Sequence, residues 1–243
     1  MKNSLTALAL VLVTFTSNAQ EIQRALKPFS KIIASPKINV VLEQGEREHI
    51  RLVYDNVSSA KINIVERGNT LHIYLDDAKK IERNERLRDL GSSHTMYENV
   101  HITAYITYTQ LQKMEIRGNQ QLTVLGAINN EHFTLRAYGQ NIITISALNV
   151  DFFKAALYGE NKLRIKDGKV VEQKYRLYGE NRIDTKRVKS AYASTSIFGQ
   201  GDVRLTSTEE VRVNAFGEPD IQVNGGAQVN KRLIFGNVDI VEQ

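Results

Sequence analysis

The chain has 243 residues, of which 42% are hydrophobic and only three are proline, so it can fold into one large or two small packed domains. Its formal net charge of +5 is modest for this length and does not indicate a nucleic-acid partner. It contains no cysteine, which removes the thiol that disulfides, thiol catalysis and lipoprotein anchoring require. Stability is therefore expected to come from packing alone.

Residues 1–19 are typical of a secretory signal peptide. Lys2 supplies a positive charge, an almost unbroken apolar run follows from Leu5 to Phe15, and small residues precede Gln20. The run is too short to span a bilayer with any margin, and no later stretch approaches the roughly 20 apolar residues of a membrane helix. We therefore expect an exported chain without a transmembrane segment, placed in the periplasm, at the outer membrane or outside the cell.

Residues 20–110 are expected to form an N-terminal β region. Short segments in which apolar and polar residues alternate, bounded by turn residues, are typical of strands with one wet face. These segments cover residues 29–34, 38–43, 49–54, 60–66, 70–75 and 100–108. Residues 76–99 interrupt them with dense charges of both signs, which fits a solvated loop or a short helix with Ile81, Leu87 and Leu90 on one side.

Residues 111–243 contain an aromatic-Gly pair that recurs at almost constant spacing. Counted from Gly118, successive glycines lie 21, 20, 20, 20, 18 and 19 residues apart. This regularity predicts a β-solenoid with coils of about 20 residues. The pairs are Tyr138-Gly139, Tyr158-Gly159, Tyr178-Gly179, Phe198-Gly199, Phe216-Gly217 and Phe235-Gly236.

Alignment of the coils on each glycine separates inward from outward positions. Apolar residues occupy the positions two before, four after and six after the glycine. For example, Leu163, Ile183 and Val203 lie four residues after successive glycines. The glycine itself is expected to adopt a positive φ or to let two backbones approach closely. Glu242 takes a core position in the last coil, which predicts a fading end whose open edge could pair with a second copy.

Two sets of outward residues are candidate ligand contacts. The aromatic column could be a platform for sugar rings or an apolar partner, or a stacked ladder that only stabilises the coils. The basic stretch 162–189 could attract acidic polysaccharide or lipopolysaccharide phosphates, or could be a solvated outer face. The candidate residues are Tyr138, Tyr158, Tyr178, Phe198, Phe216, Lys162, Arg164 and Arg182.

Two further columns repeat along the coils. Asn141, Asn161 and Asn181 follow successive glycines by two residues and predict a hydrogen-bonded asparagine ladder. Asp202, Asp220 and Asp239 occupy one column of the last three coils, where they are either a weak calcium site or solvent-screened charges. The histidines have no paired spacing and no catalytic motif is present, so we expect no catalytic residue, no metal and no cofactor.

The chain resembles the GIN-domain family of putative auto-transporter adhesin heads, a family of unknown function common in secreted proteins of Bacteroidota. The similarity lies in residues 29–32, 38–45, 68–73 and 111–118, followed by the repeats. The resemblance implies a right-handed parallel β-helix joined to an N-terminal β region, and an adhesin-like role. It offers no catalytic residues to carry over.

Together these features favour an exported, adhesin-like binding module that presents a β-solenoid surface to glycan, envelope or protein ligands and is not an enzyme. A self-associating structural envelope protein, oligomeric through the ends of the β-helix, is the alternative. A polysaccharide lyase or hydrolase fits less well, because coils of 18–21 residues leave no room for long catalytic loops.

Overall fold

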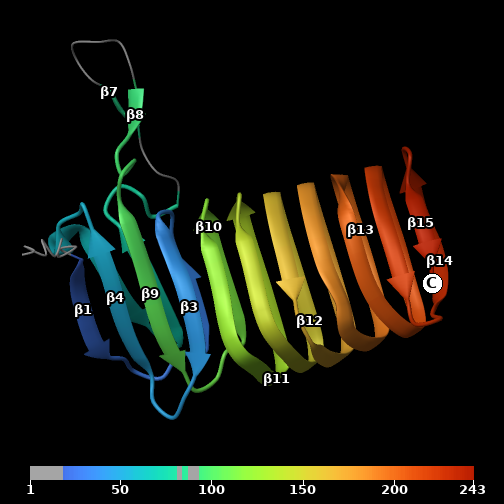
Figure 1. The fold of residues 1–243 in the computed structure, drawn as a ribbon, viewed down its shortest axis with the longest axis horizontal. Helices are drawn as coiled ribbons and strands as arrows, with labels where there is room; N and C mark the ends of the chain where they lie inside the picture. Colours follow the sequence, from blue (N-terminus) through green and yellow to red (C-terminus); the bar gives the residue numbers. More distant parts are fainter. Residues whose placement is uncertain (1–18, 81–83, 87–92) are drawn as a thin grey trace, which may run out of the picture.

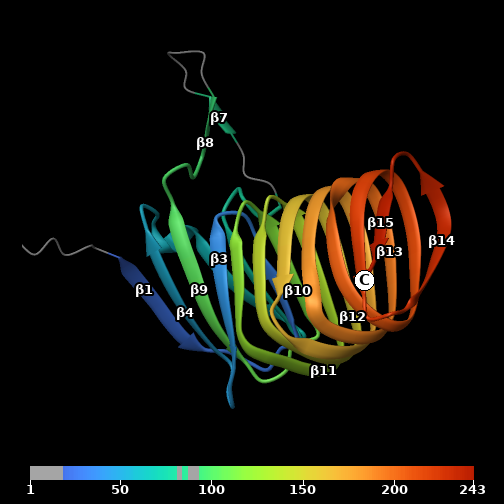
Figure 2. The same cartoon turned by 45° about the vertical axis from the view of Figure 1, so that its right-hand side comes forward.

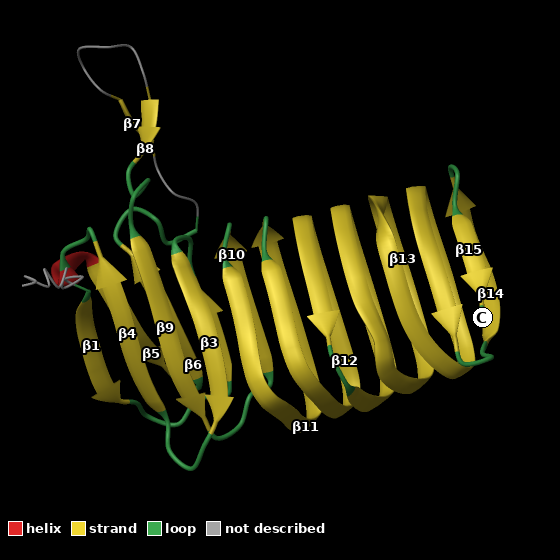
Figure 3. Cartoon of the chain, in the orientation of Figure 1, coloured by secondary structure: helices red, strands yellow, loops and turns green. Residues whose placement is uncertain are grey.

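A computed structural model describes residues 19–80, 84–86 and 93–243. The expected signal peptide falls almost entirely on residues 1–18, which lie outside the described residues, as do Ile81, Leu87 and Leu90. The described chain is almost entirely β-structure apart from one short 3₁₀ helix, η1 (Ser59–Lys61), as Figure 3 shows. The expected all-β solenoid preceded by an N-terminal β region is confirmed.

The N-terminal strands form two branches of the 13-stranded sheet that continues through the solenoid (Figure 1). In one branch the antiparallel pair β5–β6 leads by parallel pairing into β2, β10 and the second half of β11. In the other, β1 and β4 lead antiparallel into β9, and then β3 and the first half of β11 follow in parallel. The strands of this region are β1 (Gln20–Ala25), β2 (Lys31–Ala34), β3 (Ile38–Gln44), β4 (His49–Asp55), β5 (Ile62–Arg67), β6 (Thr70–Leu75), β9 (His101–Tyr108) and β10 (Lys113–Gly118).

The remaining strands form the successive coils, and the first three of them are long because they bend around the corners. Figure 2 shows them as curved ribbons stacked along one axis. Adjacent coils pair in parallel and in register, so Gly139 lies beside Gly159 and Gly159 beside Gly179. They are β11 (Gln121–Gly139), β12 (Ile142–Ile165), β13 (Gly168–Asn224), β14 (Gln228–Phe235) and β15 (Asp239–Glu242).

One hydrophobic core runs through both parts of the molecule. The three predicted apolar columns point into it, and Leu163, Ile183 and Val203 are each almost completely buried. Ile234 and Ile240, the members of these columns in the last coil, are only partly buried. These side chains are less buried than their counterparts in earlier coils, as the expected fading of the repeat requires.

The glycine corners are confirmed at Gly179. Its φ is +97°, and a Cβ built on it would lie 2.5 Å from the carbonyl oxygen of Gly159 in the preceding coil. Any other residue would therefore strain the backbone and push two coils apart. The recurrence of glycine follows from this close approach.

The charged insertion differs from the helix considered for it. Its described parts include two short strands, β7 (Asn84–Arg86) and β8 (Ser93–Thr95), which pair antiparallel. Figure 1 shows this pair projecting away from the solenoid. Pairing between these two strands gives their backbone N–H and C=O groups hydrogen-bond partners, as a helix would have done within a single segment.

Candidate functional site

The aromatic residues that precede the corner glycines form a continuous stack. Ring centroids of neighbours lie 4.8 to 5.1 Å apart, and the ring planes differ by only 3 to 13°. Tyr178 is 37% exposed, Phe198 38% and Phe235 59%. The stack therefore lies on the outside of the solenoid and is not covered by the N-terminal sheet.

The stacking changes what this column offers to a ligand. Parallel rings at this spacing cover much of one another's faces. What faces water is the ring edges, and for Tyr138, Tyr158 and Tyr178 the phenol hydroxyls, one in each of three successive coils. The column is thus an edge lined with hydroxyl groups, and open ring faces for sugar stacking are limited to its ends.

The predicted asparagine ladder stabilises the corner from inside, and it is confirmed. The side chain of Asn141 donates to Asn161 Oδ1 at 2.8 Å, and that of Asn161 donates to Asn181 Oδ1 at 3.0 Å. Each of the three amides also donates to the carbonyl of the tyrosine three residues earlier. The ladder therefore fixes the backbone that carries the aromatic column.

A cluster of four cations lies beside the aromatic column on the same outer face, which we call the aromatic face. Arg136 and Arg176 occupy one row across the coils, with the small side chain of Ala156 between them. Lys154 and Lys174 are direct neighbours in the next row. We call these four side chains the basic cluster.

The electrostatics show that the four charges act on one another. Burial, and then the positive charges of Arg176, Arg136 and Lys174, lower the pKa of Lys154. This lowering of the pKa requires the other positive charges to lie close to Lys154, and the sheet holds them there. The arrangement is an uncompensated positive surface, and it attracts anions.

A shallow groove adjoins the basic cluster on the side away from the tyrosines. It has a volume of about 330 Å³ and contains the stacked pair His132 and Phe152, whose ring centroids are 5.0 Å apart. Phe152 is exposed. The groove is lined by His132, Thr134, Phe152, Phe153, Lys154, Glu172 and Lys174.

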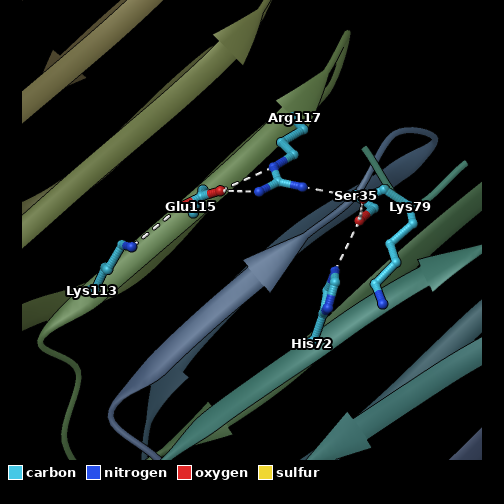
Figure 4. Close-up of polar contacts among 6 residues, drawn as sticks. All are labelled: Ser35, His72, Lys79, Lys113, Glu115 and Arg117. Atoms are coloured by element: carbon cyan, nitrogen blue, oxygen red, sulfur yellow. Dashed lines mark hydrogen bonds and ion pairs between the residues drawn. The ribbon is translucent and has the colours of Figure 1, made fainter. Parts of the chain in front are cut away.

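Toward the N-terminal sheet, the same face carries a polar network built around one carboxylate (Figure 4). Glu115 lies next to Arg136 in its row and is almost fully buried, with ion pairs to Lys113 at 3.2 Å and to Arg117. Burial raises the pKa of Glu115, but hydrogen bonds from Arg117 and Lys113 outweigh it and hold the pKa below its ordinary value. Lys113 and Arg117 therefore share one carboxylate, whereas none of the described ion pairs includes a member of the basic cluster.

The network continues to His72 and anchors the base of the insertion. His72 Nε2 lies 3.1 Å from Ser35 Oγ, whose hydroxyl donates to the carbonyl of Lys79 at 2.6 Å. Arg117 donates to the same carbonyl at 3.3 Å. Burial, with the charges of Lys79 and Arg117, lowers the pKa of His72 to about 4. Ser35 is completely buried, so this grouping holds structure together and offers no accessible nucleophile.

The basic residues predicted from the sequence lie on the other side of the glycine corners, on what we call the groove face. Arg164 pairs with Asp184 at 3.3 Å, and Arg182 pairs with Glu180 at 3.5 Å and with Asp202 at 3.6 Å. Lys162 and Arg182 line two adjoining open grooves of about 420 and 310 Å³. The structure thus separates these residues from the aromatic face and compensates two of them.

The aspartate column lies at the C-terminal end of the groove face. Asp220 and Asp239 are ladder neighbours, and Asp202, Asp220 and Asp239 line one open groove of about 340 Å³. Within residues 19–80, 84–86 and 93–243, no group of three or more His, Asp or Glu side chains is placed to hold a metal ion. The described structure therefore gives no support to a calcium site in this aspartate column.

The sequence reasoning missed the basic cluster. The signal was present, because these positions have the same outward parity as the aromatic column, three and five residues before the glycine. The prediction relied on the density of Lys and Arg along the sequence, which selects only the stretch 162–189. The cluster combines Arg136 and Lys154 from earlier coils with Lys174 and Arg176 from that stretch.

Comparisons with known proteins agree with this fold. A family model described as "Putative auto-transporter adhesin, head GIN domain" matches residues 28–227. A crystal structure named a putative adhesin, from Bacteroides fragilis, is 17% identical, with 94% of this chain and 98% of that chain covered and a TM-score of 0.71. One from Parabacteroides merdae, also named a putative adhesin, is 16% identical, with coverages of 93% and 97% and a TM-score of 0.68.

A third similar structure carries a different name. It is a putative lipid binding protein from Parabacteroides distasonis, 13% identical, with coverages of 93% and 97% and a TM-score of 0.63. At such identities the likeness shows the fold alone. A comparison with curated proteins finds no match. In the part of the chain that the structure describes, no helix is long and apolar enough to cross a membrane.

Proposed function

The chain belongs to the GIN-domain family of putative auto-transporter adhesin heads, and from this membership we propose that it works as an exported, adhesin-like binding module. It holds glycan, envelope or protein ligands on the outer surface of its solenoid. The aromatic face is the contact surface, and the hydroxyl-lined edge of Tyr138, Tyr158 and Tyr178 is its centre.

The observation that supports the proposal most strongly is the exposure of the aromatic column together with the neighbouring cations. A ladder needed only for stability has no requirement for hydroxyl groups, since Phe198 and Phe216 stack with the same geometry as the tyrosines. Contiguous exposed aromatic surface beside polar groups is typical of binding sites. A rigid solenoid also presents such rows at fixed spacing, without the ordering cost of a flexible loop.

A binding role is favoured over catalysis by two observations. The similar solved structures are named as adhesins and a lipid-binding protein. The described coils are linked through tight corners, and the grooves on their surface are open and shallow. Parallel β-helices that act on polysaccharides need loops carrying acids and bases beside an enclosed cleft.

The proposal is tested by binding of the purified protein to a glycan array and to immobilised envelope preparations. The triple variant Tyr138→Phe, Tyr158→Phe, Tyr178→Phe removes the three hydroxyls and keeps the stack, so we expect it to fold and to bind at least fivefold more weakly. Tyr105→Phe is the control, because Tyr105 is as exposed as Tyr178 but lies on β9. Absence of binding to every glycan and envelope preparation would overturn the proposal, and cell fractionation with protease shaving tests export.

A specific observation also supports self-association as a second function. Among the described strands, β14 and β15 pair only with β13, so each leaves one edge unpaired at the end of the solenoid. Leu233, Phe235 and Val241 are exposed there. End-to-end pairing predicts concentration-dependent oligomers in sedimentation velocity, abolished by Ile240→Lys, and a monomer at all concentrations contradicts it.

A further inference from the structure

The basic cluster has no counter-ion of its own. Across the described residues, none of Arg136, Lys154, Lys174 and Arg176 forms an ion pair with a carboxylate. Arg164 and Arg182 of the groove face, by contrast, do pair with acids. Four cations fixed on one sheet raise the local potential, and an arriving anion relieves their repulsion.

The cluster is bounded on both sides along the solenoid axis. Toward the N-terminus, the row of Arg136 continues with the carboxylate of Glu115, which pairs with Lys113 and Arg117. Toward the C-terminus, the next coil carries the hydroxyls of Ser194 and Ser196 at the corresponding positions. The uncompensated charge therefore covers three coils, a length of roughly 10 Å at about 4.8 Å per coil. That length suits several negative charges spaced along a chain better than one small anion.

The groups that flank the cluster indicate the kind of chain. On one side lie the hydroxyls of Tyr138, Tyr158 and Tyr178, and on the other lies the groove with the stacked rings of His132 and Phe152. Sugars present hydroxyl groups and apolar ring faces together, and both flanks are suited to contact them. A lipid surface would require several apolar side chains projecting beyond the cations. On the groove side, Phe152 is the one exposed aliphatic or aromatic lining residue among the described residues, and on the other side the three neighbouring aromatic rings are tyrosines with polar hydroxyl groups.

We propose that the basic cluster binds the carboxylate or sulfate groups of an anionic polysaccharide lying along the aromatic face, an inference that rests on the adhesin-like function proposed above. The guanidinium groups of Arg136 and Arg176 each engage an acidic group through two parallel hydrogen bonds. Lys154 and Lys174 act as point charges in the adjacent row. Ala156 leaves space between the two arginines, so both can reach the same stretch of polymer.

The test uses dextran sulfate and polygalacturonate as probes and neutral dextran as the uncharged match. Binding is measured by biolayer interferometry at several salt concentrations on the full chain. We expect the protein to bind both polyanions and not dextran, with affinity falling as salt rises. Arg136→Gln combined with Arg176→Gln is expected to weaken binding at least tenfold and to reduce the salt dependence.

The matched control is Arg164→Gln combined with Arg182→Gln, which removes the same charge from the groove face. We expect this control to change affinity less than twofold. Equal weakening by the two double variants would mean that net charge alone is responsible and would overturn the inference. Failure to bind either polyanion would also overturn it, as would tighter binding to phosphatidylglycerol vesicles than to the polysaccharides.

The outcomes separate this inference from the function on which it rests. If the polyanions do not bind but the glycan array or envelope preparations do, and that binding depends on the tyrosine hydroxyls, only the anionic ligand is wrong. If nothing binds, the adhesin-like function fails as well. Circular dichroism of each variant confirms that loss of binding reflects the surface and not unfolding.

Discussion

Replacement of a corner glycine tests the packing of the coils directly. In Gly179→Ala, the new Cβ would lie 2.5 Å from the carbonyl oxygen of Gly159, whereas real Cβ atoms essentially never approach closer than 3.0 Å. Two coils must therefore separate locally by about half an ångström, since 3.0 less 2.5 is 0.5. The φ of +97° adds backbone strain for alanine.

The expected magnitude follows from these two effects. Backbone strain at such a φ costs about 1 to 3 kcal/mol. Weakening of two inter-coil hydrogen bonds, at about 1 kcal/mol each, adds about 2 kcal/mol. We therefore expect Gly179→Ala to lower the free energy of unfolding by about 3 to 5 kcal/mol, with a lower urea midpoint in far-UV circular dichroism.

Gly126→Ala is the matched control within the solenoid. Gly126 also has a positive φ, of +76°, but no atom lies within 4 Å of a Cβ built there. Alanine at this position carries backbone strain without the clash, so we expect a loss of about 1 to 2 kcal/mol. If the two variants lose the same stability within about 0.5 kcal/mol, close approach between coils is not the reason for the repeated glycine.

Three further predictions concern the supports of the binding surface. Asn161→Ala removes a buried amide that donates hydrogen bonds to Asn181 and to the backbone of Tyr158, so we expect the free energy of unfolding in urea to fall by about 2 to 4 kcal/mol. The control Asn149→Ala, at an exposed position, should lower it by less than about 1 kcal/mol. Tyr158→Ser removes two stacking contacts and should lower the free energy of unfolding by about 1 to 3 kcal/mol, measured by thermal denaturation. Tyr158→Phe keeps the ring and should be nearly neutral. Equal loss of stability in the two variants would show that stacking does not stabilise the coils. His72 has its pKa lowered from 6.5 to about 4, so the unfolded chain binds its proton more readily and stability falls as pH drops from about 6.5 towards 4. As the pH is lowered over this range, the urea midpoint of His72→Gln should fall less than that of the wild type. Parallel curves of urea midpoint against pH would contradict the assignment of this pH dependence to His72.

Much of the solenoid could be predicted because its determinants are local and repeated. Leu163, Ile183 and Val203 occupy identical positions in successive coils, so their alternation with polar neighbours specified which side faces the core. The asparagine ladder was predictable for the same reason, since one position recurs at the coil spacing. By contrast, β1 has little alternation of its own and is defined by its antiparallel pairing with β4, which no local pattern shows.

The candidate site was predictable only in part. The aromatic column was placed on the outer surface by parity, but the covering of its ring faces by stacking depends on distances between coils. Two of the three basic residues chosen from charge density form ion pairs with acids, as Arg182 does with Glu180 and Asp202. Which cations lack a partner depends on the position of side chains in neighbouring coils.

The sequence by itself determined the coil length, the inward and outward sides of each strand and the glycine corners, because parallel stacking in register repeats every local rule at the same place. Only the tertiary structure decided which polar groups are satisfied and which charges are left over. Gln173 illustrates this, because its position points into the core and it is completely buried there, with hydrogen bonds to Tyr175 and Ser190. The basic cluster is the opposite case, in which successive coils bring four like charges together on one face and none of the described ion pairs joins them to an acid. Electrostatic balance depends on separations of a few ångströms in space, and those separations exist only once the coils have stacked.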